Sequence, residues 1–304
     1  TRLNIQAESL LEVRGLPHDD SSSPAFKLFV DRARRLKPDF TPSADDSAAI
    51  ARLCELVSGS PLALELAAAW ARGLTVPEIV QEIERNLDIL TASQQDLPPR
   101  HRSMRAVFDH FWNLLSAEER IVFQKQAVFR GGFTRESFQE ITGAGLPLLS
   151  RFVDKSAFHL SENGRYRRHS LMVQYAGLRL RENPSLHDET RAGHAHYFGA
   201  FVKRLESDFL GGQPQKAMPP FLADLANIRL AWDWAVEHHD ASIFNNISDS
   251  IMQAFDLAGL YREAFQMAEA ANRSLESLPK SAKRETVIAK GRVMGLAGAF
   301  LFRL

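Results

Sequence analysis

Apolar side chains recur three and four positions apart along most of the chain, which is the spacing of amphipathic helices. The first such stretch carries Ala25, Phe26, Phe29, Val30 and Ala33. Similar stretches follow Ser43 and Pro77 and fill most of the chain beyond Pro184. The pattern therefore predicts a mainly α protein.

Helix-start signals divide the first part of the chain into short helices. Ser43 and Asp46 have the spacing of a capping box, and Ser60 followed by Pro61 is typical of a helix start. Gly59 lies between them and is the expected helix stop. We expect helices from Ser43, over 62–71 and over 77–90. Residues 17–95 would then form a helical subdomain, followed by a polar linker over 91–100.

The helical period is interrupted once. Two short runs, Phe158-His159-Leu160 and Tyr166-Arg167-Arg168, flank the dipeptide Asn163-Gly164, which is the strongest short signal for a β-hairpin. Helix-forming segments precede the hairpin from Met104 onward, with cap signals at Ser116 and Thr134, and another follows from Ser170. Helices followed by a hairpin are typical of a winged-helix domain, here over 96–182.

Beyond Pro184 the pattern predicts helices alone, near 188–206, 219–238, 241–257 and 260–277. Paired helices of this length, separated by short polar breaks, favour a helical array similar to tetratricopeptide (TPR) repeats over 183–304. Trp232 and Trp234 lie among the apolar positions of this region, and we expect them to pack between paired helices.

Composition excludes some classes of protein. The chain has 304 residues and a net charge of zero, from 37 Lys plus Arg and 37 Asp plus Glu. This balance excludes a disordered polyelectrolyte and a strongly basic nucleic-acid coat, although it allows a local basic patch. No apolar run approaches the roughly 20 residues of a membrane helix. The single cysteine, Cys54, excludes an intrachain disulfide and is expected in the core.

No metal site or catalytic nucleophile is predicted. His194 and His196 are two residues apart and would face different sides of a helix, whereas His238 and His239 are adjacent. Neither pair has the i, i+4 spacing of helical zinc ligands. The chain also lacks the Gly-x-Ser-x-Gly sequence of a nucleophile elbow.

Both ends suggest a piece of a longer protein. The chain opens at Thr1 without a Met or a signal peptide, and it closes at Leu304 inside an apolar segment.

Three stretches in order resemble the STAND signalling ATPases, the group that includes plant NB-ARC ATPases, apoptotic ATPases and bacterial regulators. The first runs from Arg2-Leu3-Asn4-Ile5 to Leu16. The second, Gly59-Ser60-Pro61-Leu62-Ala63, is similar to the Gly-x-Pro motif of that group. The third, Arg168-His169-Ser170-Leu171, falls where the group has Met-His-Asp. The resemblance covers residues 1–182 and continues through Leu225-Ala226-Asn227-Ile228-Arg229.

This resemblance implies a nucleotide site at Gly59, Pro61 and His169. Pro61 would pack on the adenine ring, and His169 would hydrogen-bond the β-phosphate of ADP and so hold an off state. The simpler interpretations are a helix-start proline and a half-buried histidine. Two departures, Arg168 for Met and Ser170 for Asp, put the phosphate contact in doubt.

The resemblance also implies what the chain does not contain. Residues 1–16 would be the last edge of a nucleotide-binding domain, and the phosphate loop and the Mg²⁺-binding acidic strand would lie upstream of Thr1. The cofactors would be ADP or ATP, with Mg²⁺ held by that upstream domain. The chain has no Gly-x-x-x-x-Gly-Lys-Ser/Thr sequence and is not expected to hydrolyse ATP alone.

Three cations, Arg165, Arg167 and Arg168, fall on the proposed hairpin. They suit contact with the phosphates of nucleic acid, but charged residues also protect a solvated strand edge from pairing. The zero net charge favours the second interpretation or an intramolecular role.

Three functions remain open. The first is the regulatory arm of a cytoplasmic STAND-type ATPase. This arm would clamp ADP against the upstream domain, receive a signal ligand or protein on its C-terminal helices, and open for self-association. The second is a DNA-binding winged-helix transcriptional regulator. The third is a helical protein-interaction scaffold without nucleotide control. No membrane partner is expected.

Overall fold

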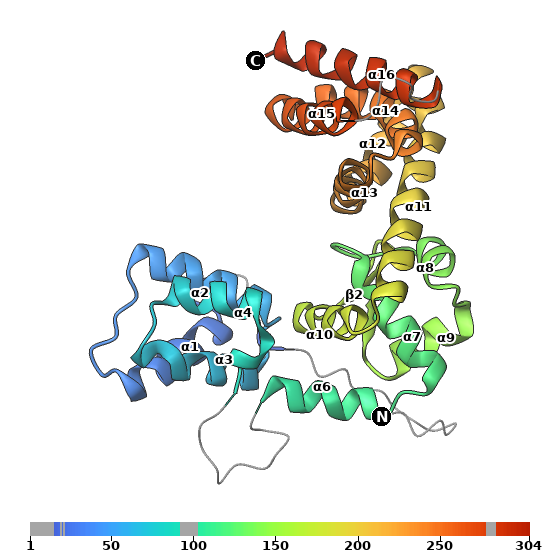
Figure 1. Ribbon diagram of the computed structural model, residues 1–304. Helices are drawn as coiled ribbons and strands as arrows, with labels where there is room; N and C mark the ends of the chain where they lie inside the picture. The colour runs from blue at the N-terminus through green and yellow to red at the C-terminus, as the bar shows by residue number, and fades with distance from the viewer. Residues whose placement is uncertain (1–14, 19, 21, 92–102, 278–283) are drawn as a thin grey trace. The chain divides into compact units, whose positions relative to one another are not determined.

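The computed structural model describes residues 15–18, 20, 22–91, 103–277 and 284–304. Over these residues the chain is mainly helical with one two-stranded antiparallel sheet, which confirms the predicted fold class (Figure 1). Most of the first resembling stretch and most of the predicted linker lie outside the described residues. The described chain forms two compact units. One contains the residues up to Ala127 together with Gly145–Ser161 and Arg167–Glu182, and the other contains Val128–Ala144, Glu162–Tyr166 and the residues from Asn183 onward.

The first unit begins with a small bundle of helices, drawn in blue and cyan in Figure 1. Its elements are α1 (Pro24–Leu36), α2 (Ala44–Leu56), α3 (Pro61–Ala68), the 3₁₀ helix η1 (Ala69–Arg72), α4 (Val76–Arg85) and the 3₁₀ helix η2 (Leu87–Ile89). Helix α1 packs against α3, and α2 packs against α4. The capping box of Ser43 and Asp46 is confirmed.

Two predicted helix ends in this bundle are wrong. The helix expected over 62–71 tightens into a 3₁₀ turn at Ala69. The helix expected over 77–90 stops at Arg85, because Asn86 is extended and its side chain accepts a hydrogen bond from the Asp88 amide, which starts η2.

The same unit continues through α6 (Met104–Asn113), α7 (Ala117–Lys125), α9 (Leu146–Asp154), β1 (Phe158–Leu160) and α10 (Ser170–Arg181). The 3₁₀ helix η3 (Gln126–Val128) and the strand β2 (Tyr166–Arg168) each have one residue, Val128 and Tyr166, in the second unit. An aromatic cluster centred on the fully buried Phe123 holds these helices together. The Phe123 ring contacts Phe111, Phe152 and Tyr175 at centroid separations of 5.4, 6.3 and 6.4 Å.

The sheet is the predicted hairpin. Gly164 has a φ of 76°, and the Arg165 amide donates to Oδ1 of Asn163 at 3.3 Å, so the Asn163-Gly164 dipeptide reverses the chain as expected.

The second unit contains α8 (Arg135–Thr142), α11 (Pro184–Leu210), α12 (Pro214–Ala223), α13 (Leu225–His238), α14 (Ala241–Ala258), α15 (Tyr261–Glu276) and α16 (Arg284–Leu301). The long helix α11 packs against α13 and α14, and α16 packs against α14 and α15 (yellow to red in Figure 1). Trp232 is buried, and its indole N–H donates to the Met267 carbonyl at 3.0 Å, so its predicted packing between helices is confirmed.

The single helix predicted over 219–238 is wrong. The chain leaves helical geometry at Asp224 (φ −110°, ψ 10°) and divides into α12 and α13. Among the described residues, no helix combines the length and the apolar character that a membrane span requires. The division of the chain into four segments stays a prediction.

Candidate functional site

The turn after α2 has an unusual backbone. Ser58 and Gly59 both adopt left-handed geometry, with φ of 48° and 64°. The Leu16 amide donates to the Gly59 carbonyl at 2.8 Å, and a Cβ on Gly59 would lie 2.1 Å from the Leu16 carbonyl oxygen. A side chain on Gly59 is therefore disfavoured by the backbone angle and excluded by the close approach of the Leu16 carbonyl.

His169 meets this turn. Its Nε2 lies 2.8 Å from the Val57 carbonyl, and its Nδ1 accepts a hydrogen bond from the Leu171 amide at 3.2 Å, which caps α10. Because Nδ1 is an acceptor, the ring proton is on Nε2 and is donated to Val57. Burial lowers the pKa of His169, although the bond to Val57 opposes this shift, so the neutral ring is favoured.

The structure thus brings together residues that the sequence had assigned to a nucleotide. His169 contacts the carbonyl two residues before Gly59, and Pro61 is the exposed first residue of α3. The fit to a phosphate is incomplete, however. The amides of Ser58 and Gly59 donate to carbonyls in the last turn of α2, and the Ser60 amide donates to the Val57 carbonyl. Both ring nitrogens of His169 are also used. The nucleotide-binding role of these residues stays a prediction.

The three hairpin cations differ in surroundings. Arg165 forms a bidentate pair with Asp224, at 2.6 and 2.8 Å. Arg168 donates to the backbone carbonyl and the side-chain oxygen of Gln126. Arg167 is exposed. Of these three side chains, Arg167 is therefore the one that faces solvent.

A further exposed cation lies on α9, the helix that precedes the hairpin. This helix buries Leu148, Leu149 and Phe152 and leaves Arg151 exposed. Sequence reasoning did not select Arg151. The spacing of the apolar residues in this segment could have identified it, because that spacing places position 151 on the solvent-facing side of the helix.

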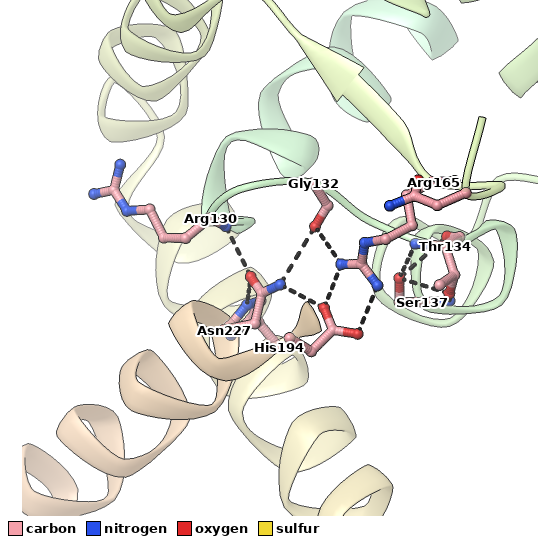
Figure 2. Close-up of polar contacts among 9 residues, drawn as sticks. Arg130, Gly132, Thr134, Ser137, Arg165, His194 and Asn227 are labelled. Atoms are coloured by element: carbon pink, nitrogen blue, oxygen red, sulfur yellow. Dashed lines mark hydrogen bonds and ion pairs between the residues drawn. The ribbon is translucent and has the colours of Figure 1, made fainter. Parts of the chain in front are cut away.

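A buried polar network lies at the start of α13 (Figure 2). Asn227 contacts the 130–132 segment, His194 and Asp224, and Asp224 holds Arg165. Asn227 belongs to the stretch Leu225–Arg229, through which the resemblance to STAND ATPases continues. Asp224 was not selected from the sequence. The Asp-x-x-Asn spacing places both residues on one side of the first turn of α13.

Among the residues that the structure describes, no three His, Cys, Asp or Glu side chains gather as metal ligands would. His194 is buried against Asn227, and His196 lies 3.6 Å from Asp240. Cys54 is buried, and desolvation raises the pKa of its thiol to about 11, as expected for a core residue rather than a nucleophile.

Comparison with known proteins links the chain to bacterial regulators. It is 28% identical over 233 residues to proteins of Mycobacterium tuberculosis and Mycobacterium bovis that are named putative HTH-type transcriptional regulators. The match covers 73% of this chain and 26% of those proteins. It is also 34% identical over 175 residues to an uncharacterised protein of Mycobacterium tuberculosis, which covers 53% of this chain and 44% of that protein.

No family model and no solved structure matches the chain. The chain spans about a quarter of the length of the mycobacterial proteins named as putative transcriptional regulators.

Proposed function

We propose that the chain is part of a bacterial transcriptional regulator that binds DNA through α9 and the β1–β2 hairpin. The similarity to proteins named putative HTH-type transcriptional regulators carries this proposal, because it extends over 73% of the chain. The order of elements agrees with it. Helices are followed by a two-stranded hairpin, which is the layout expected of a winged-helix domain.

The charges suggest where DNA would be contacted. Arg151 on α9 and Arg167 on β2 are exposed and belong to the same compact unit. Guanidinium groups of this kind contact phosphates and release counterions, so the affinity would fall with rising salt concentration. We assign no DNA contact to Arg165 or Arg168, since their side chains bond to Asp224 and Gln126.

A titration of labelled duplex DNA with the intact chain, followed by fluorescence anisotropy at two salt concentrations, tests the proposal. We expect binding at low salt that weakens steeply as the salt concentration rises. Arg151→Gln and Arg167→Gln should each reduce the slope of log K against log salt by about 0.9, the value for one phosphate contact.

Arg262→Gln is the matched control. Arg262 is an exposed arginine on α15, so its replacement changes the net charge equally without altering α9 or the hairpin. This variant should bind DNA as the parent chain does. Absence of DNA binding at low salt would contradict the proposal. An equal loss of DNA affinity in all three arginine variants would contradict the proposed role of α9 and the hairpin.

A second candidate function is the arm of a nucleotide-controlled regulator. The contact between His169 and the Val57 carbonyl favours it, since His169 belongs to one of the motifs that resemble STAND ATPases and Val57 lies two residues before another, which starts at Gly59. ADP or ATP and Mg²⁺ would then be held mainly by another domain, with His169 donating a hydrogen bond to the β-phosphate. In NMR spectra of the chain, ADP should shift the His169 ring signals and adenosine should not. Identical spectra with millimolar ADP would contradict a direct contact between His169 of this chain and the nucleotide.

A further inference from the structure

The turn of the hairpin holds an asparagine followed by a glycine, a pair that occurs once in the chain. Asn163 and Gly164 are both exposed, and both belong to the second compact unit. Asparagine is one of the chemically labile residues of proteins, because its carboxamide can be lost by reaction with the backbone. The turn therefore places a labile side chain in contact with water.

The backbone nitrogen of Gly164 is the group that can attack this side chain. It is covalently held next to the Asn163 carboxamide, so the two reacting groups need no bimolecular encounter. Glycine has no Cβ to hinder the approach. Among the residues that the structure describes, none accepts a hydrogen bond from the Gly164 amide. Its proton is therefore open to removal by solvent, which leaves the nitrogen as a nucleophile.

The carboxamide of Asn163 is held by the residue that follows the glycine. The Arg165 amide donates to Oδ1 of Asn163 at 3.3 Å. Attack at Cγ develops negative charge on this oxygen, and a backbone N–H that is already directed at it stabilises that charge. The same turn thus supplies the nucleophile and a donor for the oxyanion.

We propose that the turn is a site of spontaneous covalent modification, at which Asn163 cyclises to a succinimide and is hydrolysed to aspartate or isoaspartate. In the first step a bond forms between the Gly164 nitrogen and Cγ of Asn163, and the bond from Cγ to Nδ2 breaks. Nδ2 leaves as ammonia and carries away the proton of the Gly164 amide. Water then opens the ring. Addition at Cγ gives aspartate, and addition at the backbone carbonyl carbon gives isoaspartate.

The modification changes the turn in two ways. It adds a carboxylate directly before Arg165, whose guanidinium is paired with Asp224. Isoaspartate also lengthens the main chain, because the chain then passes through the side-chain carbon. Tyr166 and Phe133 exchange two backbone hydrogen bonds just beyond the turn, at 2.8 and 3.1 Å. The start of β2 has to accommodate the added length. This inference goes beyond the proposed function and does not depend on DNA binding.

Peptide mass spectrometry of the intact chain, incubated for days in warm, mildly alkaline buffer, tests the proposal. We expect position 163 to convert to a mixture of aspartate and isoaspartate, because both arise from the cyclic intermediate. An isoaspartate methyltransferase with a labelled methyl donor identifies the second product. Aspartate without isoaspartate would overturn the proposal. So would an intact Asn163 after a time in which the urea-unfolded chain is converted at this position.

Two other asparagines are internal controls in the same digest. Asn86 is exposed, and its Oδ1 also accepts from the amide two residues further on, at 2.9 Å, but the next residue is the buried Leu87. Asn183 is exposed as well, and Pro184 after it has no N–H that could be lost. Each should be modified at least about tenfold more slowly than Asn163.

Gly164→Ala is the matched variant. Gly164 has a left-handed φ of 76°, but an added Cβ would meet nothing within 4 Å, so the turn has space for the methyl group. The methyl group hinders the attacking nitrogen, and we expect modification of Asn163 to slow at least about tenfold. An unchanged rate in this variant, or equal rates at Asn163 and the two control asparagines, would overturn the proposal.

Discussion

Gly59 has no room for a side chain because another part of the chain crosses it. Its carbonyl binds the Leu16 amide, and its missing Cβ faces the Leu16 carbonyl oxygen. The sequence identified Gly59 as a helix stop, which its left-handed φ of 64° supports. The close approach of Leu16 was not visible in the sequence, since nothing in the local pattern pairs residues 43 positions apart.

Gly59→Ala should lower the free energy of unfolding by more than about 2 kcal/mol, because it combines backbone strain with a clash. Gly143→Ala is the control. Gly143 has a φ of 77° and open space around its missing Cβ, so only the strain of roughly 1 kcal/mol applies. Urea unfolding of both variants measures the difference. Equal losses would show that the contact with Leu16 contributes nothing.

His169 should make stability depend on pH. Burial is the main cause of its lowered folded-state pKa, and the charge of the nearby His159 acts in the same direction. In the unfolded chain the pKa is about 6.5, so below this pH the unfolded state binds more protons than the folded state. The stabilisation is therefore fully present above pH 6.5 and is lost as the pH falls from there through the lower folded-state pKa.

Urea midpoints of the parent chain and His169→Asn between pH 8 and pH 5 measure this contribution. We expect the asparagine variant, which retains a capping side chain for α10, to lose less stability on acidification than the parent chain. The same pH dependence in both proteins would rule out a protonation penalty at His169.

At the scale of elements, local signals predicted helix starts well. The caps at Ser43, Ser60, Ser116 and Thr134 are all present, because each depends on residues within one turn. The break at Asp224 was missed for the opposite reason. Its carboxylate accepts hydrogen bonds from Arg165, which lies 59 residues earlier. No local sequence pattern predicts a contact over that separation.

The capping box of α7 carries a second long-range contact. Glu119 accepts from the Ser116 amide at 2.8 Å and from Nζ of Lys155 at 2.7 Å. Desolvation opposes ionisation of this carboxyl, but the Lys155 and Ser116 contacts outweigh it and hold the pKa of Glu119 below its usual value. The ammonium group thus stabilises both the cap and the packing of α7 near the end of α9.

Lys155→Met should lower the free energy of unfolding by about 2 kcal/mol or more, because it leaves the buried Glu119 carboxylate without its cation. Lys203→Met removes the exposed partner of Glu206 and should change stability by less than about 1 kcal/mol. Thermal or urea unfolding compares the two variants. Similar small changes would mean that the Lys155–Glu119 pair adds no more than a surface pair.

At the scale of the molecule, the sequence predicted a mainly α chain with one hairpin, and the structure confirms it. It also grouped Arg165, Arg167 and Arg168 on the hairpin. Their surroundings separate them, since the guanidinium groups of Arg165 and Arg168 bind partners that are distant in the chain, whereas Arg167 is exposed. Burial and long-range pairing, rather than residue type, leave Arg151 and Arg167 as the cations assigned to DNA.

Occupancy of DNA in living cells is the most direct measure of whether this chain belongs to a DNA-binding regulator. The protein that carries this chain would be epitope-tagged in its bacterium and cross-linked, and the co-purified DNA would be sequenced. We expect enrichment at discrete promoter regions that is strongly reduced by the double substitution Arg151→Gln and Arg167→Gln. Enrichment no greater than in an untagged strain would contradict a DNA-binding regulator, and enrichment unchanged by the double substitution would contradict DNA contact through α9 and the hairpin.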